Sequence, residues 1–317
     1  MLCAPLPEED DSTMTALASR PVSAPPARGP GHVAWPLLVS AVAAAGVALI
    51  YQVFVLRALG QSVDTAALQG ADVGHPRAVE LMNRALNGTT LVSLVLVCLA
   101  AAAIGVIRRR LDLAVGAGLL VLAANATSQV LKNALDRPDL DGFPAPNSFP
   151  SGHTTAAASV AFALVLVLPT AIRGMVSLIG ATYVAVIAVA TVWAEWHRPS
   201  DTIAALLVVL AWGGLVAAGL RARRMRAPAA AGRRSRVSAV LFLLTAAVTT
   251  AVAAVGLIAV AMSERVTPDL VSGRFAFLTG AAGITAAVAA TFLIWVRLAA
   301  GDHPTTPVET DAQGGTR

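Results

Sequence analysis

The stretch NSFPSGHTTAAAS, residues 147–159, joins a polar loop to an apolar run of membrane-spanning length. A helix that begins at this boundary offers free backbone N–H groups and the positive end of the helix dipole, which together bind anions. Gly152 lets an anion approach the backbone closely, and the Ser151 hydroxyl is a donor as well as an ordinary N-cap. His153 is placed to give or take a proton near neutral pH. Simple helix capping explains Ser151 and Gly152 equally well when the stretch is taken alone.

The composition is that of a membrane protein. Of the 317 residues, 56% are hydrophobic and only 13% are charged, about half the charged share of a soluble domain. Uncharged apolar stretches recur at the length of about 20 residues that crosses the hydrocarbon core of a bilayer. The sequence therefore predicts an all-α, polytopic membrane helix bundle. Its eight expected spans are 33–56, 85–107, 113–131, 154–172, 174–194, 202–220, 237–263 and 275–296.

The arginines predict the orientation of the bundle. They occur at 108–110, at Arg173 and throughout 221–236, in connections that fall on one side if the spans alternate. Short loops rich in arginine stay cytoplasmic. We therefore expect a multi-pass protein of the plasma (inner) membrane with both termini in the cytoplasm, where 1–30 and 301–317 form disordered tails. Contact of the basic loop with anionic lipid is expected rather than nucleic-acid binding.

Unusual polar residues gather at the opposite, extracytoplasmic ends of the first six spans. Asn125, Gln129 and Lys132 share one face of the third span, and Lys132 is the only lysine in the chain. Ordinary packing between membrane helices also uses Asn and Gln, and a boundary lysine also extends its amine toward water. Arg137 follows where Pro138 ends the helix, and its planar guanidinium suits phosphate or carboxylate oxygens.

The stretch AEWHRPSDTIAA, 194–205, connects the fifth and sixth spans. His197 and Asp201 lie four residues apart, so their side chains share a face if the segment is helical. A carboxylate that accepts from one imidazole nitrogen orients the ring and leaves the other nitrogen free to react. Alternatively, His197 is an interfacial residue beside Trp193 and Trp196 in an aromatic belt.

Three motifs together resemble the signatures of the type 2 phosphatidic acid phosphatase superfamily, which includes the vanadium haloperoxidases. They are KNALDRP (132–138), PSGH (150–153) and HRPSD (197–201), and the resemblance covers about 88–220.

The resemblance implies a domain organisation. A six-helix phosphatase core would occupy 31–220 and would be followed by a basic cytoplasmic loop at 221–236. Two additional transmembrane helices would occupy 237–300. We also expect an interfacial helix near 77–88, in the long outer loop, to cover the site.

The resemblance also implies catalytic roles. His197 would be the nucleophile that attacks phosphorus and forms a phosphohistidine, and Asp201 would orient it. His153 would be the general acid that protonates the leaving oxygen. Water would then hydrolyse the intermediate.

Five further residues are expected to bind the phosphate. Lys132, Ser151 and the backbone of Gly152 match the family pattern and would hold phosphoryl oxygens. Two arginines of that pattern are absent from their usual positions. Arg137 and Arg198 are the nearby replacements, and we expect them to complete the pocket.

The expected function is hydrolysis of a lipid phosphate or pyrophosphate monoester at the extracytoplasmic face, without a metal or other cofactor. Candidate substrates are polyprenyl (pyro)phosphates, phosphatidic acid and phosphatidylglycerophosphate. One alternative is a lipid phosphotransferase, and another is a catalytically weak or inactive lipid-binding scaffold of the same fold. A transporter is disfavoured because the eight spans contain no Asp, Glu, Lys or Arg.

Overall fold

The computed structural model describes residues 31–71, 80, 84, 91–223, 236–267 and 270–300, and within these ranges the chain contains helices and no strand. The helices are α1 (Gly31–Ile50), the π-helical turn η2 (Tyr51–Val55), α2 (Ala58–Gln69), α4 (Leu91–Ile107), α5 (Leu111–Ala134), α6 (Gly152–Val167), α7 (Arg173–Trp193), α8 (Pro199–Arg223), α9 (Arg236–Arg265) and α10 (Gly273–Ala300).

The predicted all-α membrane bundle is confirmed. Within the described residues, each expected apolar stretch coincides with a helix, except that 33–56 covers both α1 and η2, and six helices are long and apolar enough to cross a membrane. These six are His32–Val55, Leu111–Ala134, Arg173–Trp193, Pro199–Arg223, Arg236–Arg265 and Gly273–Ala299. The other two, α4 and α6, are apolar helices of 17 and 16 residues. At about 1.5 Å per residue they are slightly shorter than the hydrocarbon core is thick.

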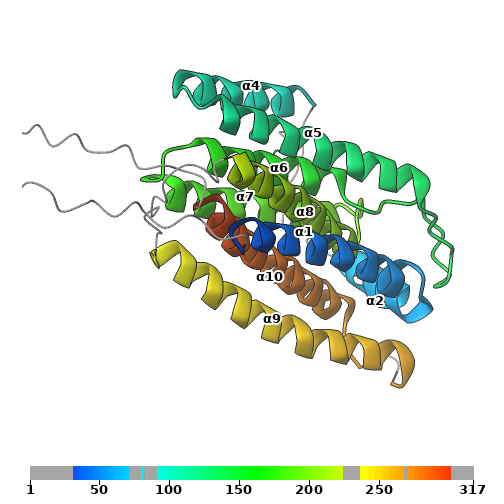
Figure 1. Ribbon diagram of the computed structural model, residues 1–317. Coiled ribbons are helices and arrows are strands. Elements are labelled where there is room, and N and C mark those ends of the chain that lie inside the picture. Colours follow the sequence, from blue (N-terminus) through cyan, green and yellow to red (C-terminus); the bar gives the residue numbers. More distant parts are fainter. Residues whose placement is uncertain are drawn as a thin grey trace, which may run out of the picture.

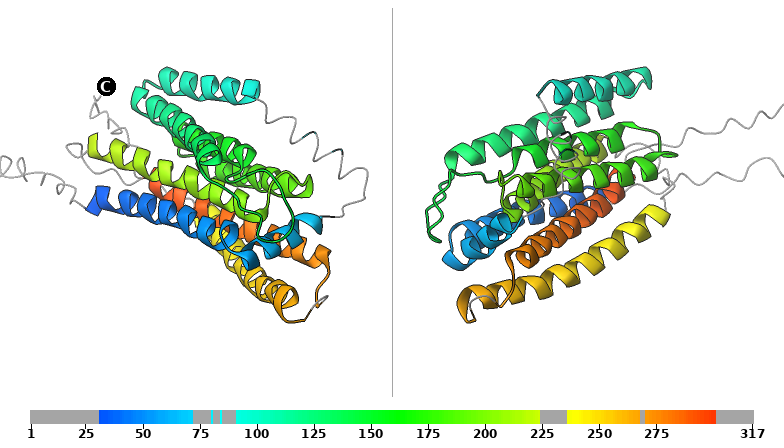
Figure 2. Two further views of the ribbon diagram at one scale, coloured as in Figure 1. Left: turned by 90° about the vertical axis from the view of Figure 1, so that its right-hand side faces the viewer. Right: turned by 180° about the vertical axis from the view of Figure 1, so that it is seen from behind.

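The helices run side by side, with α4 along one edge of the bundle and α9 along the other (Figure 1). Helix α8 lies between α1, α5, α6 and α10 and is buried along most of its length. The two further views show the same arrangement, with α9 packed on the outside of α10 (Figure 2).

The last two helices differ in how they join the bundle. Helix α10 enters the hydrophobic core, where the Trp295 ring stacks on Phe162 of α6 with ring centroids 4.9 Å apart. The Trp295 indole N–H also donates to the Phe162 carbonyl over 3.0 Å, which satisfies a polar group that burial would otherwise penalise. Helix α9, by contrast, leaves most of its large apolar side chains exposed, as suits a face directed at lipid.

Three arginines at the end of the bundle remote from the polar loops bind the C-terminal carbonyls of neighbouring helices. Arg108 donates to the Val167 carbonyl at the end of α6, and Arg173 donates to the Ala299 carbonyl over 3.0 Å. Arg221 donates to a carbonyl near the end of α10. Cations are favourable at helix C-termini because the dipole is negative there. Arg221 was expected in the basic loop, but α8 continues to Arg223, so Arg221 is a buried helical residue.

The connection after the first span contains a helix earlier in the sequence than the interfacial helix expected near 77–88. Helix α2 occupies Ala58–Gln69, directly after η2, and packs against α10, α9 and α8. The interfacial helix expected near 77–88 lies almost entirely outside the described residues.

Candidate active site

The ends of α5, α6, α7 and α8 meet around one pocket of about 360 Å³, whose wall is part polar and part apolar. Lys132 is in the last turn of α5, His153 in the first turn of α6, and His197 and Arg198 between α7 and α8. The pocket is lined by Leu68, Lys132, Phe143, Ala145, Pro146, Asn147, Ser148, His153, Glu195, Trp196, His197 and Arg198. Four residues expected from the sequence therefore line a single cavity.

The two histidines face each other across this pocket. Their ring centroids are 6.2 Å apart, and the His153 ring also lies 5.3 Å from that of Trp196. His197 is buried, whereas His153 is only partly buried at the start of α6. The two imidazoles are therefore in edge-on contact, and both border the cavity.

Asp201 is a fully buried carboxylate behind His197. Its side chain is 0% exposed and lies with Oδ2 3.7 Å from His197 Nδ1. That distance is an ion-pair contact but is too long for a hydrogen bond. Oδ1 accepts from Arg137 Nη2 over 2.6 Å, and Oδ2 accepts from the Ser148 hydroxyl over 2.5 Å and from the Arg198 backbone N–H over 3.0 Å. Three donors therefore fix the carboxylate that neighbours His197.

The two expected replacement arginines occupy different places. The Arg137 side chain is 3% exposed and pairs with Asp201, and it is not among the residues that line the pocket. Its Nε and Nη1 are buried and make no hydrogen bond within the described part of the chain. Arg198 lines the pocket, donates through Nε to Thr65 over 3.2 Å and lies 5.9 Å from the Phe143 ring centroid.

At the start of α6, Ser151 caps the helix and Gly152 leaves space beside the backbone. The Ser151 hydroxyl accepts from the Thr154 N–H over 3.3 Å, so Ser151 is an N-cap as its side chain alone suggested. A Cβ added to Gly152 would lie 3.7 Å from Gln129 Nε2 and 3.9 Å from Lys132 Nζ. Gly152 therefore leaves a gap between the backbone of α6 and the Lys132 amine.

Two asparagines link α5 to α6 and to the segment before α6. Asn125 donates to the Ser159 hydroxyl of α6 over 3.1 Å, which is the interhelical packing role that asparagine commonly has in membranes. Asn147 donates to the Lys132 and Leu135 carbonyls over 3.1 and 2.8 Å and so satisfies the C-terminal end of α5.

Sequence reasoning missed the polar face of α2. Gln61, Asp64 and Thr65 are all buried, and they contact the segments before α6 and the first turn of α8. Gln61 donates to the Pro138 carbonyl over 2.7 Å, and Thr65 donates to the Asp141 carboxylate over 2.5 Å. The spacing of three and four residues within ALGQSVDTAALQ is the available signal, because it places these side chains on one helical face.

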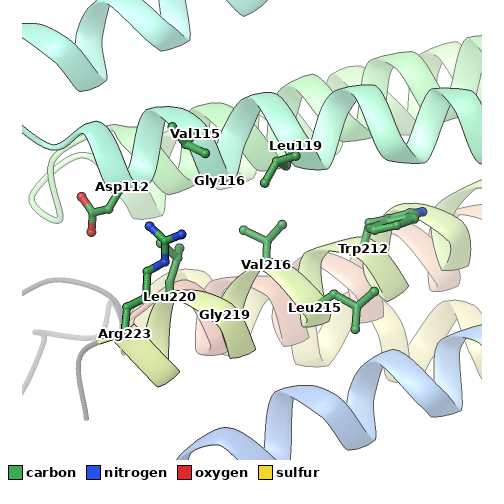
Figure 3. A pocket seen from close by; sticks show the side chains of 10 residues that line it. All are labelled: Asp112, Val115, Gly116, Leu119, Trp212, Leu215, Val216, Gly219, Leu220 and Arg223. Atoms are coloured by element: carbon green, nitrogen blue, oxygen red, sulfur yellow. The ribbon is translucent and has the colours of Figure 1, made fainter. Parts of the chain in front are cut away.

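Two other cavities lie outside this pocket. One of about 270 Å³ is almost wholly apolar, is walled by η2, α2, α8, α9 and α10, and has Asp64 and Ser200 on its wall. The other, of about 240 Å³, lies between α5 and α8 at the far end of the bundle, with Asp112 and Arg223 at one end of its lining (Figure 3). Neither holds the histidines. In the described ranges, no three His, Cys, Asp or Glu side chains are grouped so that they could hold a metal ion.

The comparison with family models agrees with the motifs. Residues 113–226 match the family model described as the PAP2 superfamily, which is the family that the three motifs resemble. Among solved structures, the chain is similar to a transmembrane PAP2 type phosphatidylglycerolphosphate phosphatase from Bacillus subtilis. The identity is 21%, the match covers 61% of this chain and 96% of that chain, and the TM-score is 0.43. The chain matches no curated protein.

Proposed function

We propose that this chain, which carries the PAP2 superfamily segment, is an integral membrane phosphatase that hydrolyses a lipid phosphate or pyrophosphate through a phosphohistidine on His197. The observation that supports this most is the grouping of His197, His153 and Lys132 around one pocket, with Asp201 buried behind His197. A nucleophile, an acid, a cation and an orienting carboxylate are the parts that covalent phosphoryl transfer requires.

In the first step, His197 Nε2 attacks phosphorus while the bond from phosphorus to the leaving oxygen breaks. His153 gives its proton to that oxygen, so the lipid alcohol or phosphate leaves as a neutral or less charged group. The proton on His197 Nδ1 faces Asp201, and we expect the separation of 3.7 Å to shorten as positive charge develops on the ring.

In the second step, water attacks the phosphorus of the phosphohistidine. His153, now neutral, takes a proton from this water, and the bond from His197 to phosphorus breaks. Inorganic phosphate leaves, and both histidines return to their starting protonation states. His153 thus acts as the acid in the first step and as the base in the second, as microscopic reversibility requires.

Charge stabilisation in this proposal comes from Lys132, from Arg198 and from the backbone N–H groups at Gly152. Lys132 and Arg198 line the pocket, and Gly152, the first residue of α6, lies next to the Lys132 amine. Arg137 neutralises Asp201 from the opposite side and is not part of the pocket wall. In this proposal Arg198 binds phosphate directly, whereas Arg137 acts by holding Asp201.

The proposed substrate class is a lipid because the pocket lies at the ends of membrane-spanning helices. A head group would enter from the water while the apolar chain stays among helices or lipid. The basic connections at the other end of the bundle favour an extracytoplasmic site and cytoplasmic termini.

The test is phosphate release by the purified chain in detergent with a chelator present. A panel of polyprenyl phosphate and pyrophosphate, phosphatidic acid and phosphatidylglycerophosphate would be compared with a water-soluble phosphate ester. We expect chelator-resistant release from at least one lipid. No release from any of them would favour the scaffold alternative, and appearance of a phosphorylated alcohol in place of phosphate would favour the phosphotransferase.

Gly152→Ala should weaken phosphate binding without unfolding the chain. The added Cβ makes only ordinary contacts and alanine favours a helix more than glycine, so we expect an unchanged or higher Tm. The same methyl group fills the gap beside Lys132, so KM should rise by about tenfold. Gly118→Ala on α5, whose Cβ meets nothing within 4 Å, is the control. Equal KM values for the two variants would show that the gap does not hold substrate.

A further inference from the structure

We propose that Asp64 is a positioning residue that holds the first turn of α8, and with it Asp201 and His197, and that its charge state governs how tightly the pocket binds phosphate. The proposal deepens the function proposed above and rests on it. Asp64 is 2% exposed on α2, far from the three motifs in sequence.

The Asp64 carboxylate binds the start of α8 at two points. Oδ1 accepts from the Ser200 backbone N–H over 3.1 Å, and Oδ2 accepts from the Ser200 hydroxyl. Helix α8 begins at Pro199, so this N–H belongs to the first turn, whose donors have no partner within the helix. Asp64 therefore caps α8 from a separate helix, and its negative charge complements the positive end of the α8 dipole.

This cap is one residue from the catalytic carboxylate. Asp201 follows Ser200 directly, and its backbone carbonyl accepts from the Ser151 N–H over 2.9 Å. A shift of the first turn of α8 would thus move Asp201 away from His197. It would also displace Ser151, the N-cap residue of α6. A misplacement of about 1 Å in such an array costs about 100-fold in rate.

Helix α2 holds the rest of the site in the same way. Thr65, next to Asp64, accepts from Arg198 and donates to Asp141. Gln61 accepts from the Leu140 N–H over 3.1 Å and donates to the Pro138 carbonyl. One face of α2 therefore joins the connection before α6 to the connection before α8, and Asp64 is its charged member.

The charged groups around Asp64 come from the site itself. Asp201, Arg137 and Arg198 interact with it electrostatically, and Asp141 lies next to Thr65. Helices α9 and α10 and the turn η2 contribute uncharged residues to the apolar cavity that Asp64 borders, within the described chain. The one charged residue of α7, Arg173, is at its far end and bonds to Ala299.

These surroundings make the charge of Asp64 responsive to pH. Burial, followed by the neighbouring charge of Asp201, raises the pKa of Asp64 from 3.8 to about 7. Above that pH the carboxylate adds a negative charge close to the pocket that has to bind an anion. Phosphate affinity should therefore fall as Asp64 ionises, by a factor on the order of ten for one charge within a protein.

The test compares the full-length wild type with Asp64→Asn, Asp64→Ala and the control Gln69→Ala, an exposed residue of the same helix. The dissociation constant of inorganic phosphate is measured at pH 6 and pH 8, without turnover. Because phosphate itself titrates in this range, the informative quantity is the ratio of the wild-type Kd to the variant Kd. From pH 6 to pH 8, we expect the wild-type Kd divided by the Asp64→Asn Kd to rise about tenfold. The wild-type Kd divided by the Gln69→Ala Kd should stay constant.

Turnover measures the positioning role separately. Asparagine can still accept from the Ser200 N–H and bind its hydroxyl, so kcat at pH 6 should remain within about threefold of the wild type. Alanine removes the cap, and kcat should fall by about 100-fold with a smaller change in KM. A kcat of Asp64→Ala equal to that of the wild type would overturn the proposal. So would a ratio of the wild-type Kd to the Asp64→Asn Kd that does not change with pH. Because phosphate binding needs no turnover, a chain that binds phosphate but releases none would refute the function and still test Asp64.

Thermal unfolding provides a third readout if Asp64→Ala does not fold. A carboxyl whose pKa is higher in the folded than in the unfolded chain binds more protons when folded, so stability falls as the pH rises from about 4 to about 7. We expect the Tm of Asp64→Asn to rise relative to the Tm of the wild type as the pH increases across this interval. A constant difference in Tm would show that Asp64 does not titrate there.

Discussion

Replacing His197 by alanine should abolish phosphate release from a lipid phosphate, with a loss in kcat of at least about 10⁴-fold. His197 lines the pocket, faces His153 and lies against the buried carboxylate of Asp201, so no other described side chain has its combination of access and orientation. The measurement is single-turnover phosphate release in detergent with a chelator, together with phosphate binding to show that the pocket is intact.

The control for this experiment is again Gly118→Ala, because its added Cβ contacts nothing and α5 is otherwise unchanged. Binding of phosphate with normal affinity by His197→Ala would confirm that only the nucleophile is missing. Release that survives in His197→Ala at more than about a hundredth of the wild-type rate would refute the assignment of His197 as nucleophile.

Replacing Arg137 by alanine should have the second largest effect, on both turnover and stability. Arg137 and Asp201 form a buried ion pair with side chains 3% and 0% exposed and atoms 2.6 Å apart. Removing one partner leaves the other charge uncompensated, which costs about 3–5 kcal/mol of stability. The freed Asp201 carboxylate would also be drawn toward other donors, so kcat should fall by about 100- to 1,000-fold.

A double-mutant cycle separates these two effects. Asp201→Asn removes the charge that Arg137 neutralises, so Arg137→Ala combined with Asp201→Asn should recover much of the stability lost in Arg137→Ala. It should not recover turnover, because an amide stabilises the positive charge of His197 far less than a carboxylate. Additive losses of stability in the two single variants would show that the pair contributes no coupling energy.

The bundle could be predicted from the sequence because each span has a local signature of its own. The eight apolar stretches and the arginines between them depend only on the bilayer, which acts on each helix in the same way. The grouping of Lys132, His153, His197 and Asp201 followed from placing three motifs at one end of that bundle, and the structure brings them together.

The remaining parts of the site depend on contacts that no local pattern reports. Asp64 meets Ser200 across 136 residues, and Thr65 meets Arg198 across 133. The position of Arg137 behind Asp201 depends likewise on how the connection after α5 folds back over the start of α8. A lone arginine or aspartate in sequence is usually solvated, and only the packed bundle shows that these are buried and paired.

The stereochemical course at phosphorus distinguishes a phosphohistidine from direct attack by water. The wild-type chain would hydrolyse a lipid phosphorothioate whose terminal phosphorus is made chiral with sulfur and two oxygen isotopes, in water that carries the third isotope. The configuration of the inorganic thiophosphate would then be determined. Two successive in-line displacements, first by His197 and then by water, each invert phosphorus, so we expect net retention of configuration. Net inversion would mean that water attacks the substrate directly and would contradict the phosphohistidine.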